Sequence, residues 1–184
     1  DRPVVVDKSR AWISSVDLVF SIWPNAKILV PVRDVRGIIC SMEKKRVKHP
    51  SFMNGIEQQD PTNWTTIDKR AQAWLQSPPV GIAIERLYEA VNKYKDKLMF
   101  INAKNLTEDT QSVMNSVWEY LEEDPFVHNT SNVEQYTQEY DVGFPYGDHV
   151  IRQEVKPLIN DWHEILGREL SEQIRMKFEW INNL

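Results

Sequence analysis

Cysteine is nearly absent from the sequence, and the one residue present is Cys40. A single cysteine excludes an internal disulfide and a metal site built from several cysteines, so we expect a reducing compartment and a cytoplasmic location. Long apolar runs are also absent, since none approaches the roughly 20 residues of a membrane-spanning helix. We therefore expect no membrane segment here, and the start at Asp1 lacks the pattern of a signal peptide.

Glycine is scarce, and positive charge does not dominate. Lys and Arg number 22 against 27 Asp and Glu, which gives a formal net charge of -5 at pH 7. This acidic balance disfavours broad binding to nucleic acid or to an anionic membrane, so any anion site must be local. The six glycines include no Gly-Lys-Ser/Thr sequence, which argues against the phosphate loop of a kinase.

Short β-branched runs alternate with stretches of helical periodicity along the 184 residues. This alternation predicts one α/β domain over residues 1–184, with a three-layer arrangement in which helices flank a parallel sheet. Residues 47–63 and most of residues 126–157 are expected to be irregular. Strands are predicted over residues 3–6, 27–32 and 97–101, and helices over residues 11–23, 64–76, 80–94, 107–121 and 162–181, with a further helix capped by Asp34.

Three cations follow the first two predicted strands: Lys8, Arg10 and Arg33. Ligands of parallel sheets bind at the carboxyl ends of the strands, where helix N-termini also point. We expect the three cations to converge there and to attract phosphate or sulfate.

Residues 26–42, AKILVPVRDVRGIICSM, carry a strand, a short turn and a helix. This segment resembles the motif by which sulfotransferases bind the 3′-phosphate of their donor, 3′-phosphoadenosine 5′-phosphosulfate. In that family an Arg at the strand end and a Ser eight positions later hold the phosphate, which here implies Arg33 and Ser41. The alternative is an ion pair between Arg33 and Asp34, with Ser41 facing a carbonyl.

Residues 3–12 are similar to the preceding strand and Lys-bearing turn of many sulfotransferases. The resemblance implies that Lys8 lies near the transferred group, where a cation stabilises developing negative charge. Arg10 stands where the cytosolic branch has a His that acts as general base, and a guanidinium does not deprotonate. The base is therefore unassigned, with His49 and His149 as candidates and an ordinary cap or surface histidine as the alternative for each.

Later segments extend the resemblance over most of the chain. Residues 99–109 are similar to the family's strand and Tyr-Glu-Asp-Leu turn, although Ala103 replaces the Tyr, so no site residue is transferred there. Residues 126–137 and 147–152 resemble a bacterial and phage-associated branch. The second segment resembles a loop that closes over the nucleotide, which implies Arg152 near the 3′-phosphate, with an exposed arginine as the alternative.

The resemblance implies a P-loop nucleoside-kinase-like sulfotransferase fold, incomplete at its N-terminus because the first strand and the phosphosulfate loop are not recognised. It implies transfer of a sulfuryl group to a hydroxyl or amine of a small-molecule or glycan acceptor, without a metal. Phe52 and Trp64 are candidates for stacking on the acceptor, with core packing as the alternative. A catalytically inactive nucleotide-binding or interaction module remains open, whereas a P-loop kinase is disfavoured. The sequence does not indicate an oligomeric state.

Overall fold

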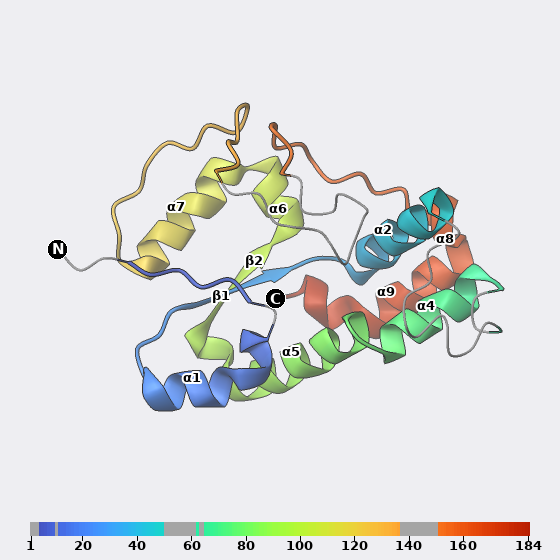
Figure 1. Ribbon diagram of the computed structural model, residues 1–184, viewed down its shortest axis with the longest axis horizontal. Helices are drawn as coiled ribbons and strands as arrows, with labels where there is room; N and C mark the ends of the chain where they lie inside the picture. The colour runs from blue at the N-terminus through green and yellow to red at the C-terminus, as the bar shows by residue number, and fades with distance from the viewer. Residues whose placement is uncertain (1–3, 10, 50–61, 63–64, 137–150) are drawn as a thin grey trace.

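The computed structural model describes residues 4–9, 11–49, 62, 65–136 and 151–184 (Figure 1). The protein is α/β and mostly helical, with two parallel strands. The strands are β1 (Ile28–Val32) and β2 (Leu98–Asn102). The helices are η1 (Trp12–Ser15), α1 (Val16–Ile22), α2 (Val35–Lys48), α4 (Ile67–Gln76), α5 (Val80–Tyr94), η3 (Lys95–Lys97), α6 (Ala103–Glu108), α7 (Thr110–Leu121), α8 (Trp162–Leu166) and α9 (Arg168–Asn182).

The two strands pair in parallel from Ile28 opposite Leu98 to Val32 opposite Asn102. A parallel pair needs a crossover, which the chain makes through α2, α4 and α5. Figure 1 shows α6 and α7 above the strands in this view, and α1 and α5 below them. The carboxyl ends of both strands thus fall at one edge, where α2 and α6 begin.

The core lies mainly between α2, α4 and α9. Ile39 of α2 and Ala71 of α4 are fully buried, and Ile174 of α9 is 2% exposed. Between α2 and α4, Glu43 accepts hydrogen bonds of 2.8 and 2.5 Å from Arg70, and both side chains are nearly buried. This packing fixes α2 against the rest of the domain.

Helix ends agree with the local capping chemistry of the sequence. Asp34 caps α2 as predicted, and α5 has the predicted bounds. The helix predicted over residues 107–121 is two helices: Asn102 caps α6, Thr107 lies within α6, and Asp109 caps α7. The prediction of a single helix over residues 162–181 was also wrong. The chain forms α8 and α9, separated at Gly167, whose φ of +75° is not helical.

The predicted strand over residues 3–6 is not a strand in its described part. Residues 4–9 have no regular structure, and Val5 and Val6 are 86% and 80% exposed. A β-branched run forms a stable strand only where a neighbouring strand accepts its hydrogen bonds and a face of it is buried. The described sheet accordingly has two strands and not three.

None of the helices in the described part of the chain combines the length and the apolar character needed to cross a bilayer.

Candidate functional site

The candidate site is built where β1 ends and α2 begins. Val32, the last residue of β1, lies opposite Asn102 of β2 and is buried. Arg33 and Asp34 follow, so both project from the carboxyl edge of the sheet, as predicted for a site-bearing turn.

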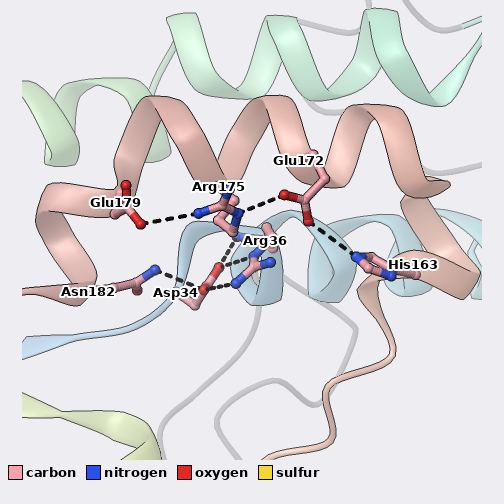
Figure 2. A network of polar contacts seen from close by, with 7 residues as sticks. All are labelled: Asp34, Arg36, His163, Glu172, Arg175, Glu179 and Asn182. Carbon is pink, nitrogen blue, oxygen red and sulfur yellow. Dashed lines mark hydrogen bonds and ion pairs between the residues drawn. The ribbon is translucent and has the colours of Figure 1, made fainter.

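Asp34 accepts four hydrogen bonds, three from Arg36 of α2 and one from Asn182 at the end of α9 (Figure 2). Its Oδ1 accepts from the backbone N–H of Arg36 at 2.9 Å, which caps α2. The guanidinium of Arg36 donates to both carboxylate oxygens, at 2.9 and 2.7 Å, and Asn182 Nδ2 donates to Oδ2 at 2.9 Å. Burial opposes the charged form, but these hydrogen bonds outweigh it, and the pKa of Asp34 lies below its ordinary value.

Two consequences follow for the predicted site. The carboxylate of Asp34 already occupies the N-terminus of α2, so an external anion would be held there by side chains and not by the helix end. The alternative of an ion pair between Arg33 and Asp34 is not the observed arrangement, because Arg36 is the cation that pairs with Asp34.

Arg36 also joins α2 to α8. Its guanidinium carbon lies 4.1 Å from the centre of the Trp162 ring, within the range of a cation–π contact. On α9, Arg175 donates to Glu172 at 2.7 Å and to Glu179 at 3.1 Å, as Figure 2 shows. The pairs of Arg175 lie within α9, whereas the Arg36–Trp162 contact and the Asn182–Asp34 hydrogen bond fix the start of α2 against the two C-terminal helices.

The side chain of Arg33 extends over the first turn of α2. A Cβ built on Gly37 would fall 2.9 Å from Arg33 Nε, 3.2 Å from Nη2 and 3.4 Å from Cζ, so the half-buried guanidinium lies on the bare backbone of Gly37. Within the described part of the chain, no hydrogen bond or ion pair engages this guanidinium. Its charge is therefore available to an external anion.

The second acid near Arg33 is Asp161, just before α8, and it too has another partner. Lys44 Nζ lies 2.5 Å from Asp161 Oδ2. This hydrogen bond is the main reason that the pKa of Asp161 is lowered, and the charge of Arg33 adds a smaller contribution. Arg33 thus interacts with Asp161 through the charges alone, because the ion pair of Asp161 is with Lys44.

Ser41 lies on the same side of α2 as Gly37, one turn further along. It is half-buried, and among the described residues its hydroxyl has no hydrogen bond to a carbonyl or to any other group. Residues four apart on a helix share a face. The structure therefore brings the Arg33 guanidinium and the Ser41 hydroxyl to one face of α2.

Two other predicted site residues, Lys8 and Arg152, have no contact with Arg33 in the described part of the chain. Lys8 lies in the exposed, irregular segment 4–9, so no strand carries it to the sheet edge. Arg152 is exposed in a segment that pairs with residues 130–133, through Val133 N to Gln153 O at 2.7 Å and Val155 N to Thr130 O at 2.8 Å.

Several further predictions fall outside the described residues: those for Arg10, Phe52, Trp64 and His149. His49 is the C-cap residue of α2, and its backbone N–H donates to Lys45 O at 2.9 Å. Cys40 is buried, and burial followed by the charge of Asp161 raises the pKa of its thiol to about 11. A thiol with this pKa is protonated near neutral pH, which disfavours Cys40 as a nucleophile.

A depression of about 360 Å³ lies beside β2 and the end of α9. Its polar lining includes Asn102, Asn105 and Asn182, and its apolar lining includes Phe100 and Val113. Asn182 thus belongs both to this depression and to the group that holds Asp34. Within the described residues, no group of three or more His, Cys, Asp or Glu side chains is arranged to hold a metal ion.

The residues that sequence reasoning missed are those that orient Arg33. Gly37 was not singled out, although the spacing of Arg33, Gly37 and Ser41 by four residues each was visible in the sequence. The role of Asn182 had no local signal, because it comes from the far end of the chain. Comparisons of this chain with protein-family models, with curated proteins and with solved structures gave no match.

Proposed function

We propose that this chain is a sulfotransferase-like domain that binds 3′-phosphoadenosine 5′-phosphosulfate, with Arg33 and Ser41 on the 3′-phosphate. The proposal rests on the resemblance of residues 26–42 and on one observation of the structure. The guanidinium of Arg33 has no anionic partner among the described residues, while both acids near it, Asp34 and Asp161, are paired with other cations. An unneutralised arginine beside a free hydroxyl suits a phosphate group.

The reaction proposed is transfer of the sulfuryl group to a hydroxyl or amine of a small-molecule or glycan acceptor. The acceptor attacks sulfur and loses its proton to solvent, the bond between sulfur and the bridging oxygen breaks, and adenosine 3′,5′-bisphosphate leaves. Arg33 and Ser41 hold the donor at a phosphate that does not react, which contributes binding and orientation. Lys8 is proposed to stabilise the charge that builds on the sulfuryl and bridging oxygens.

A second candidate is binding without catalysis, by a nucleotide-binding or interaction module of the same fold. The observation in its favour is the position of Lys8 in an exposed, irregular segment without a described contact to Arg33. A nucleotide-binding module would share recognition of the 3′-phosphate with the first candidate, an interaction module would not require it, and only the first candidate requires turnover.

The test is calorimetry with two ligands, adenosine 3′,5′-bisphosphate and adenosine 5′-monophosphate, which lacks the 3′-phosphate. Arg33→Ala removes charge-assisted hydrogen bonds worth roughly 1.5–3 kcal/mol, so affinity for the bisphosphate should fall about 10- to 150-fold. Affinity for the monophosphate should change little. Ser41→Ala should act in the same direction but more weakly.

The matched control is Arg86→Ala, which removes the same charge from a surface ion pair with Glu89 on α5. It should leave both affinities unchanged. Equal losses for both ligands in Arg33→Ala would remove Arg33 from the proposed site. Failure of the wild-type chain to bind the bisphosphate would overturn the proposed function altogether.

A further inference from the structure

The contact between Arg33 and Gly37 distinguishes the first turn of α2. Three guanidinium atoms of Arg33 lie within 3.4 Å of the position that a Cβ on residue 37 would take. Carbon atoms at ordinary contact are about 3.5–4.0 Å apart, so any side chain at this position would push the guanidinium away. The absence of a side chain at Gly37 therefore determines where the charge of Arg33 sits.

This placement brings the charge one helical turn closer to Ser41. Arg33 precedes Ser41 by eight residues, whereas Gly37 precedes it by four. One turn of α-helix rises about 5.4 Å. An oxyanion that accepts one hydrogen bond of about 2.8 Å from each side fits a gap of about that length. With the guanidinium over Gly37, one phosphate group can bridge Arg33 and Ser41.

We infer that Gly37 is a positioning residue for the 3′-phosphate, because its bare backbone lets the guanidinium of Arg33 lie where it shares one phosphate with Ser41. The inference rests on the function proposed above. It gives Gly37 an indirect role, in which it positions Arg33 and has no side chain that could contact the ligand. It also implies selectivity, since displacing the guanidinium lowers affinity only for ligands that carry a 3′-phosphate.

Gly37→Ala tests this inference because stability and binding should respond in opposite directions. The added methyl group meets only the far end of a flexible side chain, and the backbone φ of Gly37 is not in the left-handed region. Alanine favours a helix more than glycine does. The variant should therefore fold with an unchanged or higher thermal midpoint, while its affinity for adenosine 3′,5′-bisphosphate falls about tenfold.

The experiment is calorimetry on wild type, Gly37→Ala, Arg33→Ala and the double variant, with the bisphosphate and with adenosine 5′-monophosphate. Gly37→Ala should leave the monophosphate affinity unchanged and should cause no further loss in the Arg33→Ala background. Circular dichroism checks the helix content of each variant. Arg33→Lys provides a second measurement: without a planar guanidinium over Gly37, it should lose bisphosphate affinity although its charge is kept.

The outcomes separate the two proposals. If Arg33→Ala shows the 3′-phosphate effect and Gly37→Ala binds the bisphosphate as wild type does, the inference about Gly37 is wrong and the proposed function stands. If Gly37→Ala weakens both ligands equally, or weakens the bisphosphate further when Arg33 is already alanine, the inference is also wrong. If Arg33→Ala lowers the affinities for the bisphosphate and the monophosphate equally, or lowers neither, the proposed function itself fails.

Discussion

Replacing Asp34 with asparagine should reveal how strongly the turn that carries Arg33 is fixed. Asparagine keeps an oxygen that can accept from the N–H of Arg36, so the cap of α2 survives. The change removes the negative charge that faces the Arg36 guanidinium at 2.7 Å. Hydrogen bonds to charged groups contribute roughly 1.5–3 kcal/mol, so the free energy of unfolding should fall by about that amount at pH 7.

The same prediction has a pH dependence with a definite sign. The pKa of Asp34 is lowered in the folded protein, so its charge stabilises the fold above the unfolded carboxyl pKa of about 3.9. The stabilisation is lost as the pH falls below that value and through the folded pKa, where the wild type becomes neutral as well. The difference between wild type and Asp34→Asn should therefore shrink in that acidic range.

Urea unfolding followed by circular dichroism at pH 7 and at stepwise lower pH measures this difference. Asp34→Ala serves as a companion, because it loses the cap as well and should be less stable than Asp34→Asn by about 0.5–2 kcal/mol. Equal stability of wild type and Asp34→Asn at pH 7, or a difference that persists undiminished in strong acid, would refute the reasoning.

Two further predictions concern α2 and the transferred group. Glu43→Ala removes the carboxylate that accepts two hydrogen bonds from the nearly buried Arg70, so the free energy of unfolding should fall by about 3–5 kcal/mol. Glu43→Leu combined with Arg70→Met should cost much less. A loss below about 1 kcal/mol in the single variant would show that the pair behaves as a surface ion pair. Lys8→Ala should leave the thermal midpoint unchanged, because Lys8 is exposed. It should lower the rate of transfer of labelled sulfate to a panel of glycan and phenolic acceptors about 100-fold. An unchanged rate would remove Lys8 from catalysis.

The elements that sequence reasoning predicted well are those with strong local signals. The apolar runs before Arg33 and before Ala103 became β1 and β2, and the break at Pro78 and Pro79 separated α4 from α5. Asp34 capped α2 because a short acidic side chain at that position binds the first free N–H groups of a helix. These features depend on only a few neighbouring residues.

The elements that sequence reasoning placed wrongly depend on distant partners. Val5 and Val6 have the composition of a strand, but a strand also needs a neighbour, and in the structure both side chains are exposed. The pairing of Asp34 likewise depends on Asn182, 148 residues away, and on Arg36 rather than on the adjacent Arg33. Helix spacing predicted that Arg33 and Ser41 could reach one phosphate. The position of the guanidinium over Gly37 could not be predicted, because it depends on the side-chain conformation of Arg33 in the folded protein.

The central claim is that Arg33 contacts the 3′-phosphate of the nucleotide, and nuclear magnetic resonance of the arginine Nε–H groups measures this directly. Loss of one resonance in Arg33→Lys assigns the Arg33 signal. Titration with adenosine 3′,5′-bisphosphate should shift that signal strongly, because a new charge-assisted hydrogen bond or a nearby phosphate charge changes its environment. Titration with adenosine 5′-monophosphate should leave it nearly in place. An Arg33 signal that stays unchanged with the bisphosphate, or that shifts equally with both nucleotides, would contradict the account.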